Sequence, residues 1–249
     1  MEKTSGFKNK VALVVGGASG MGNAVVRLLA GEGSKTHVFD IKETVDGSFQ
    51  RCDVRDYEQV RQCVRNVIER EGRIDLLFVA VGVHLFAKIE NTSIEDFERV
   101  LSINLKGPFY VLKEVLPVMR YQQYGNVVIM GSDQVFVGKG FSTVYGMSKA
   151  ALGQLTKSSA IDYAPYNVRV NCICPGTIDT PMLEYTAERF HQESGLSIEE
   201  IHEMWRTDQP IQRLGTPEEI SRAVLFLLSD DCPFMTGALV SADGGYTAR

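Results

Sequence analysis

The chain has 249 residues, of which 44% are hydrophobic, and a formal net charge of -5. At this length roughly 75% of the unfolded surface can be buried, so no disulfide or metal is needed to hold a core, and the net negative charge argues against a nucleic-acid partner. The polar start, residues 1–6, has no apolar signal region and no stretch approaches the ~18 apolar residues of a membrane span, so we expect a cytoplasmic protein without a membrane partner.

Short apolar runs alternate with amphipathic stretches along the chain. The runs have the composition of buried strands and cover Val11–Val15, Thr36–Asp40, Ile74–Ala80, Asn126–Met130, Arg169–Ile173 and Ala238–Ser241. The stretches between them have helical periodicity and cover Gly20–Gly31, Tyr57–Glu71, Ile94–Tyr121, Ser142–Ala164 and Pro217–Ser229. This alternation predicts an α/β protein with a Rossmann-like, doubly wound parallel sheet and helices on both faces. We expect residues 1–249 to form a single domain.

Two segments depart from this alternation. The segment from Ile41 to Arg51 is short, and its residues Glu43, Asp46 and Gly47 disfavour a long helix, so we predict a loop or a single turn there. From Pro181 to Thr216 a long insertion with two helical patches precedes the last helix. Long insertions of this kind are either surface decoration or lids over active sites, and we favour a lid over residues 181–216.

Cysteine and histidine usage points away from metal binding. The five cysteines form no CxxC pair, and their odd number predicts free thiols. Cys172 and Cys174 would lie on one face of a strand, where packing is the simpler explanation. The four histidines lack the spacing of metal ligands, so we predict no metal site.

The end of the first predicted strand carries a glycine-rich turn. Small residues let the backbone approach a pyrophosphate, and the N-terminus of the following helix supplies amide donors and a positive dipole end. A tight strand-to-helix turn without a ligand is the alternative. The dinucleotide contacts predicted from this turn are Gly16, Ser19, Gly20, Met21 and Gly22.

Asp40 lies at the end of the second predicted strand, downstream of Gly22. A carboxylate at this place accepts hydrogen bonds from both ribose hydroxyls and repels a 2'-phosphate. At about 4 Å and an effective dielectric near 20, such a like-charge pair costs up to about 4 kcal/mol. We therefore predict NAD rather than NADP, although Lys42 lies close enough to weaken this preference.

Tyr145 and Lys149 lie four residues apart in a predicted helix. Residues at this spacing share one face, so an ammonium lies beside a phenol and favours the phenolate. This pairing predicts a lowered pKa of Tyr145 and a role for Tyr145 as a general acid and base. The alternative is a solvated lysine near a half-buried tyrosine.

The order of these features, with Asn104 and Ser132 between the glycine turn and Tyr145 and with Pro175-Gly176 after Lys149, resembles the short-chain dehydrogenase/reductase family over nearly the whole chain. The resemblance implies that Ser132 binds the substrate oxygen and that Tyr145 exchanges its proton. Lys149 would lower the pKa of Tyr145 and hold the nicotinamide ribose. Asn104 would anchor a water molecule behind Lys149.

The resemblance also implies further cofactor contacts. Asp53 and Val54 would contact the adenine, with a helix N-cap at Asp53 or Asp56 as the alternative. Where the family usually shows Asn-Asn-Ala-Gly, this chain has Val79-Ala80-Val81-Gly82, so only Gly82 matches. The remaining implied cofactor contacts are Ala80, Tyr145, Lys149, Pro175, Gly176, Ile178 and Thr180.

Substrate contacts should come from the lid and from residues beside the catalytic ones. The mix of polar and aromatic candidates suits a small hydroxylated or cyclic compound, such as a polyol, sugar or cyclic alcohol, better than a long acyl chain. Asp133 either binds a substrate hydroxyl or is a solvated turn residue. The candidates are His84, Gln134, Phe136, Met182 and Trp205.

Two other functions remain open at this point. The general pattern also fits a 3-oxoacyl carrier-protein reductase, although Asp40 weighs against the NADPH that most of those reductases use. The departure at Val79-Ala80-Val81 suggests a dinucleotide-binding regulator without turnover, against which the intact set of Asn104, Ser132, Tyr145 and Lys149 weighs. By the same resemblance we expect a homotetramer.

Overall fold

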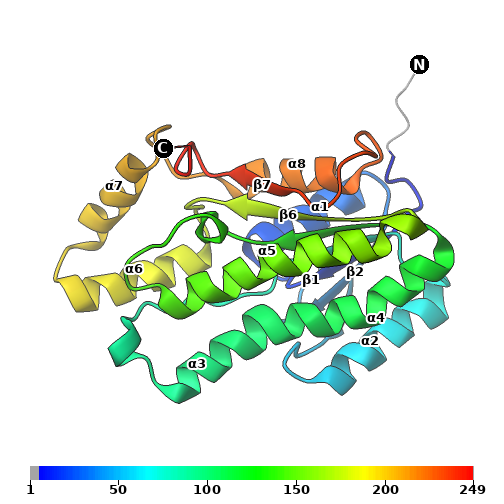
Figure 1. Ribbon diagram of the computed structural model, residues 1–249, viewed down its shortest axis with the longest axis horizontal. Helices are drawn as coiled ribbons and strands as arrows, with labels where there is room; N and C mark the ends of the chain where they lie inside the picture. Colours follow the sequence, from blue (N-terminus) through cyan, green and yellow to red (C-terminus); the bar gives the residue numbers. More distant parts are fainter. Residues whose placement is uncertain (1–5, 249) are drawn as a thin grey trace.

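The computed structural model describes residues 6–248, which form one parallel sheet flanked by helices (Figure 1). The seven strands follow the order β3-β2-β1-β4-β5-β6-β7 across the sheet, so the chain starts in the middle and winds outward in both directions. All neighbouring strands run parallel. The strands are β1 (Val11–Val15), β2 (Lys35–Asp40), β3 (Ser48–Arg51), β4 (Leu76–Val79), β5 (Gly125–Met130), β6 (Val168–Pro175) and β7 (Leu239–Ala242). Residues 1–5, most of the polar start, lie outside the described part.

Helices cover both faces of the sheet (Figure 1). The helices are α1 (Gly20–Gly31), α2 (Tyr57–Glu71), α3 (Ile94–Leu101), α4 (Gly107–Gln122), α5 (Thr143–Tyr163), α6 (Pro181–Ser194), α7 (Ile198–Asp208) and α8 (Pro217–Leu228). Helices α1 and α8 pack on one face, and α2, α4 and α5 pack on the other. The prediction of a doubly wound sheet with helices on both faces is confirmed.

Alternating residues of the central strands supply the two cores. Leu13 and Val15 of β1 belong to the core under α2, α4 and α5, whereas Ala12 and Val14 belong to the core under α1 and α8. Successive side chains of a strand point to opposite faces, so a strand covered on both sides must be apolar at every position. This requirement explains the uninterrupted apolar run of β1.

The prediction of a loop from Ile41 to Arg51 is wrong in part, because Ser48–Arg51 forms the edge strand β3. This strand pairs with β2 on one side only. Its residues are half-buried or exposed, so the segment carries no apolar run to reveal it. Glu43, Asp46 and Gly47 precede it in the connecting bend.

The predicted helix from Ile94 to Tyr121 is interrupted. α3 ends at Leu101, and Ser102–Lys106 forms a π-helical turn before α4 begins at Gly107. Short π-turns inside helices are frequent at functional sites. Here the turn contains Asn104, whose side chain is fully buried.

The insertion from 181 to 216 folds into α6 and α7, coloured yellow and orange in Figure 1. Gly195 ends α6 in the left-handed conformation at φ 75°, and a capping box between Ser197 and Glu200 starts α7. Backbone hydrogen bonds of 3.0 Å join Gly215 to Thr177 and Asp179, so both ends of the insertion are held together. The two helices thus form one attached unit beyond the sheet.

The cysteines are free thiols, as predicted. In β6 the sulfur atoms of Cys172 and Cys174 lie 3.7 Å apart in the buried interior. Within residues 6–248, no helix is long and apolar enough to cross a membrane. In the same range, no group of three His, Cys, Asp or Glu side chains is arranged to hold a metal ion.

Candidate active site

The glycine turn between β1 and α1 forms one wall of a cavity of about 400 Å³. Gly16 has a φ of 84°, a conformation that favours glycine. A Cβ atom on Gly22 would lie 2.0 Å from the carbonyl oxygen of Gly16, so no larger residue fits there. Because α1 begins at Gly20, its first N–H groups and its positive dipole end lie at the cavity. This arrangement fits the pyrophosphate of a dinucleotide.

Most of the predicted cofactor residues line this one cavity. They are Gly16, Ser19, Gly20, Met21, Gly22, Asp40, Asp53, Val54, Ala80, Gly82 and Thr180. Tyr145, Gly176 and Ile178 line an adjoining cavity instead. Pro175 is buried at the end of β6 and Lys149 is buried in α5, so these two line neither.

Asp40 is held at the rim of the cavity by two backbone groups. The N–H groups of Ala18 and Lys42 each donate a hydrogen bond of 3.0 Å to its carboxylate. Lys42 and Arg55 line the same cavity, so two cations accompany this carboxylate. Arg55 was not predicted as a site residue; its guanidinium pairs with Asp53 at 2.5 Å and lowers the pKa of that carboxyl.

Asp56, and not Asp53, caps α2. Its carboxylate accepts hydrogen bonds from the N–H groups of Glu58 and Gln59. The N-cap alternative is therefore confirmed for Asp56 and wrong for Asp53. Asp53 lies at the cavity.

The segment after β4 is held through its backbone although it lacks the polar side chains usual in the family. The N–H group of Ala80 donates to the carbonyl of Val15 at 2.8 Å. The side chain of Asn104 accepts from the N–H group of Val83 at 2.8 Å and donates to its carbonyl at 3.0 Å. The apolar sequence Val79-Ala80-Val81 therefore leaves this wall of the cavity ordered.

The four predicted catalytic residues come together at the carboxyl end of β5. Ser132 follows β5, and Tyr145 and Lys149 lie in the first turns of α5. Lys149 Nζ donates to the carbonyl oxygen of Met130 at 2.8 Å and lies 5.6 Å from the centre of the Tyr145 ring. A Cβ atom placed on Gly82 would lie 3.6 Å from both Lys149 Nζ and Asn104 Oδ1, so these two side chains approach the same point.

The predicted lowering of the pKa of Tyr145 is wrong for this structure. Burial raises the pKa of Tyr145 to about 12, a hydrogen bond with Ser132 lowers it, and the charge of Asp133 raises it. Burial also lowers the pKa of Lys149 to about 8. Tyr145 and Lys149 have the predicted spacing, but desolvation is the largest cause of the pKa shift of each residue.

A second cavity of about 420 Å³ adjoins the first and contains Ser132 and Tyr145. The two cavities share Met21, Thr180 and Met182. The predicted substrate residues that line the second cavity are His84, Gln134, Met182 and Trp205.

Phe136, also predicted, does not line this cavity. It follows the short helical turn Asp133–Val135, and 44% of its surface is exposed. The turn directs Asp133 and Gln134 inward, and both are buried. Asp133 is thus not a solvated turn residue; its carboxylate pairs with Lys139 at 2.6 Å.

His84 lies against Tyr145, with 4.6 Å between the ring centres. Its Nε2 atom is 3.2 Å from the hydroxyl of Ser142. Burial lowers the pKa of His84 to about 4, so the imidazole is neutral at physiological pH. A neutral ring can donate or accept one hydrogen bond next to Tyr145 without adding charge.

Aromatic side chains from four segments form one wall of the second cavity. Phe86 and Phe141 are stacked with 4.7 Å between their centres, and Phe190 of α6 lies 4.7 Å from Phe86. Trp205 of α7 continues the row at 6.2 Å from Phe190. Phe141 adopts a φ of 54°, which a bulky residue rarely does. Phe86 and Phe141 were not predicted, because they lie in loops without a motif.

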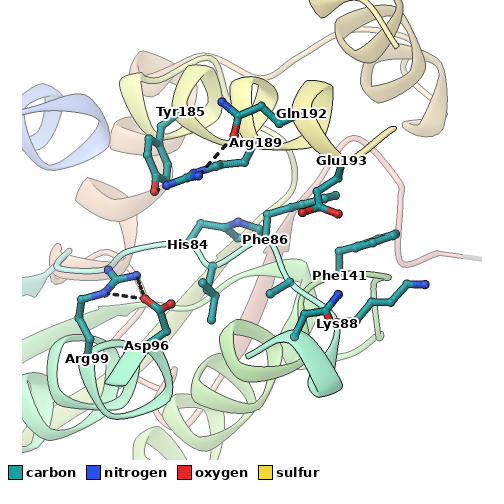
Figure 2. A pocket seen from close by; sticks show the side chains of 13 residues that line it. His84, Phe86, Lys88, Asp96, Arg99, Phe141, Tyr185, Arg189, Gln192 and Glu193 are labelled. Atoms are coloured by element: carbon teal, nitrogen blue, oxygen red, sulfur yellow. Dashed lines mark hydrogen bonds and ion pairs between the residues drawn. The ribbon is translucent and has the colours of Figure 1, made fainter. Parts of the chain in front are cut away.

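A smaller cavity of about 230 Å³ lies behind His84, Phe86 and Phe141 (Figure 2). Figure 2 shows Arg189 reaching toward it from α6 and the pair of Asp96 and Arg99, 2.8 Å apart, on the opposite side. None of the predicted catalytic residues lines this cavity. It shares His84, Phe86 and Phe141 with the second cavity.

A family model described as enoyl-(acyl carrier protein) reductase matches residues 16–247. The chain belongs to the short-chain dehydrogenase/reductase family and is an oxidoreductase. Among curated relatives, 3-oxoacyl-[acyl-carrier-protein] reductase FabG of Thermotoga maritima is 34% identical over 96% of this chain and 98% of its own length. Levodione reductase of Leifsonia aquatica is 35% identical over 98% of this chain and 97% of its own length.

Solved structures show the same similarity. Ligand-free aldohexose dehydrogenase of Thermoplasma acidophilum superposes with a TM-score of 0.93 at 33% identity, covering 98% of this chain and 96% of that one. ElxO with NADP bound superposes with a TM-score of 0.87 at 26% identity, covering 97% of this chain and 100% of that one. Relatives of this chain thus bear the names of enzymes with different substrates.

Proposed function

We propose that this protein transfers a hydride between NAD and a secondary alcohol or ketone of a small hydroxylated or cyclic compound. The observation that carries the proposal is the meeting of two cavities at Met21, Thr180 and Met182. One cavity has the cradle for a dinucleotide, and the other contains Ser132 and Tyr145. A substrate carbon and a nicotinamide can therefore meet between them.

NAD, when bound, supplies or accepts the hydride, because no side chain here can do so. Ser132 positions the substrate oxygen. In oxidation Tyr145 takes the hydroxyl proton as phenolate, and in reduction it donates its proton. The ammonium of Lys149, 5.6 Å from the ring centre, stabilises the phenolate while Tyr145 is deprotonated.

The preference for NAD rests on Asp40, whose carboxylate lies at the rim of the dinucleotide cavity. A 2'-phosphate beside it would be repelled. Lys42 and Arg55 favour NADP instead, because both are cations that line the same cavity and would attract a 2'-phosphate. One structural neighbour binds NADP. We favour NAD because Arg55 is already paired with Asp53.

The walls of the second cavity support the proposed substrate class. Aromatic rings and methionines of the insertion lie on one side, and polar groups lie on the other. The names of two relatives, levodione reductase and aldohexose dehydrogenase, agree with a cyclic or sugar-like substrate. The competing candidate is 3-oxoacyl carrier-protein reduction, which the name of the relative from Thermotoga maritima favours.

Steady-state turnover with NAD and with NADP tests these proposals. The panel contains cyclic alcohols, polyols, sugars, their ketones and a 3-oxoacyl thioester. Tyr145→Phe should lower turnover by roughly 100- to 10,000-fold while the affinity for NAD stays within a few-fold, because only the proton donor is lost. NAD binding with no turnover on any compound would instead support a regulator.

We also propose a homotetramer located in the cytoplasm. Large apolar side chains are exposed on α4 and α5, with 49% of Phe109 and 75% of Ile161 accessible. Exposed apolar groups on neighbouring helices suit an interface between copies. Light scattering of the purified protein measures the mass, and a monomer would contradict this assembly.

A further inference from the structure

The second cavity and the smaller cavity of about 230 Å³ are neighbours. His84, Phe86 and Phe141 line both of them. Side chains that belong to the walls of both cavities lie between the two spaces. A substrate in the second cavity therefore meets these three rings before any part of it can reach the smaller cavity.

Helix α6 of the insertion passes both cavities with two different faces. Leu183, Thr186 and Phe190 line the second cavity, whereas Tyr185 and Arg189 line the smaller one. Spacings of three and four residues place each set on one side of the helix. In Figure 2, Tyr185 and Arg189 reach from α6 toward the smaller cavity. The opposite face of α6 brings Phe190 to the second cavity.

Phe86, Phe141 and Phe190 form what we call the aromatic partition. Phe86 is its middle ring: Phe141 is stacked on it at 4.7 Å with 4° between the ring planes, and Phe190 lies 4.7 Å from it. The outer rings, Phe141 and Phe190, are 6.4 Å apart. Removal of the ring of Phe86 would therefore leave a gap that has an aromatic ring on each side.

The two loops that carry Phe86 and Phe141 are joined through their backbones. The N–H group of Ala87 donates to the carbonyl oxygen of Phe141 at 2.9 Å, and Ala87 and Ser142 form a parallel β-bridge. Phe141 keeps its φ of 54° in this arrangement, although this conformation is strained for a bulky residue. The partition therefore has a fixed position in the wall of the second cavity.

His84 connects the partition to the catalytic centre. Its ring lies 4.6 Å from that of Tyr145, and its Nε2 atom lies 3.2 Å from the hydroxyl of Ser142 on the second loop. Because His84 lines both cavities, the wall that separates them begins next to Tyr145. A substituent that extends from a bound substrate toward His84 therefore comes up against Phe86.

We propose that the aromatic partition determines substrate specificity by excluding a second ring on the side of His84. The substrate is then an alcohol or ketone with a single ring, or an open chain of similar size. This inference deepens the proposed function and rests on it. Protein interiors are close-packed, so a phenyl substituent cannot share the space of Phe86. In Phe86→Ala the substituent would take the place of the lost ring between Phe141 and Phe190.

The test compares cyclohexanol with 2-, 3- and 4-phenylcyclohexanol in the presence of NAD. Phe86→Ala should raise kcat/KM for at least one phenyl derivative, relative to cyclohexanol, by at least about 10-fold over the wild type. Phe141→Gly removes the neighbouring ring and relieves the positive φ, so it should favour a phenyl derivative as well. Calorimetric titration of each alcohol into the complex with NAD gives the same comparison as a ratio of Kd values, without turnover.

Phe226→Ala is the matched control, because Phe226 is a half-exposed ring of α8 that lines neither cavity. It should leave both ratios as they are in the wild type. A wild type that accepts every phenyl derivative as well as cyclohexanol overturns the inference and leaves the proposed function intact. Unchanged ratios in both Phe86→Ala and Phe141→Gly overturn it as well. If no alcohol or ketone is turned over by the wild type, the proposed function fails, and the inference about its specificity fails with it.

Discussion

The hydroxyl of Ser132 donates a hydrogen bond of 2.9 Å to Oδ1 of Asp133, the residue directly after it. Asp133 is 2% exposed, and its carboxylate pairs with Lys139 at 2.6 Å. A buried carboxylate is thus hydrogen-bonded to Ser132, the residue that we propose positions the substrate oxygen. Its charge also acts on Tyr145, whose pKa it helps to raise.

Asp133→Asn should move the pH profile of alcohol oxidation to lower pH. Oxidation needs the phenolate of Tyr145, so its rate rises with pH through the pKa of this residue. Removing the negative charge lowers that pKa, because Asp133 raises it in the wild type. The measurement is kcat/KM for oxidation across the pH range. Lys139→Met leaves the carboxylate unbalanced and should move the profile the other way; shifts of both variants in one direction would contradict this account.

Asp40→Asn should raise the use of NADP relative to NAD. The amide keeps an oxygen for the N–H group of Ala18 but removes the repulsion of a 2'-phosphate. That repulsion reaches about 4 kcal/mol for a close pair at an effective dielectric near 20, and partial exposure reduces it, so we expect about a 10-fold change in the ratio of kcat/KM values.

Asp46→Asn is the control for this change, because Asp46 lies in the same bend, bonded to Asn23, but does not line the cavity. It should leave the ratio of the two cofactors as it is in the wild type. A wild type that already turns over equally well with both cofactors would refute the role assigned to Asp40.

Lys149→Met should stabilise the protein in the absence of cofactor. Lys149 is 3% exposed and burial lowers its pKa to about 8, from about 10.5 when unfolded. Below pH 8 the lysine is charged in both the folded and the unfolded state, so the full cost of burying the charge destabilises the fold. This cost becomes smaller as the pH rises from about 8 to 10.5, because the buried lysine is then neutral. We expect a gain of about 2 kcal/mol at pH 7 that shrinks over this range. Urea unfolding at several pH values measures it, and a gain independent of pH would argue against the charge.

Trp205 should report closure of the insertion over a substrate. It is the single tryptophan of the chain and lines the substrate cavity beside Phe190. A closing lid excludes water, so a substrate added to the complex with NAD should shift the emission of Trp205 to the blue and slow amide exchange across 181–216. NAD alone should quench the emission only modestly. If a ligand that binds changes neither signal, the insertion is not a lid.

The regular elements are largely readable from the sequence because the central strands of a parallel sheet are continuous apolar runs. Strand β3 is not, since an edge strand with half-buried residues needs no such run. The interruption of the helix at Ser102–Lys106 could not be predicted from the sequence either. The sequence Ser-Ile-Asn-Leu-Lys carries no pattern that distinguishes a π-turn from an α-helical turn, whereas the structure shows Asn104 bonded to Val83 and Ser148 from this turn.

The site is readable where spacing along the chain determines it. The glycine turn, Ser132 and Tyr145 are placed by their positions at strand and helix ends. The pKa of Tyr145 could not be predicted from spacing, because it depends on burial by side chains that are distant in sequence. Phe86 and Phe141 escape for the same reason; they meet only after two loops come together.

The π-helical turn at Ser102–Lys106 also limits how the length of this segment can vary. A π-turn holds one residue more than an α-helical turn, and each residue of an α-helix advances the side chain by about 100°. Deleting one residue here would join α3 and α4 into a regular helix and swing Asn104 away from Val83 and Ser148, its present partners. In an alignment of homologues, a one-residue deletion in this helix therefore predicts that the contacts with Val83 and Ser148 are lost, even if an asparagine is aligned with Asn104.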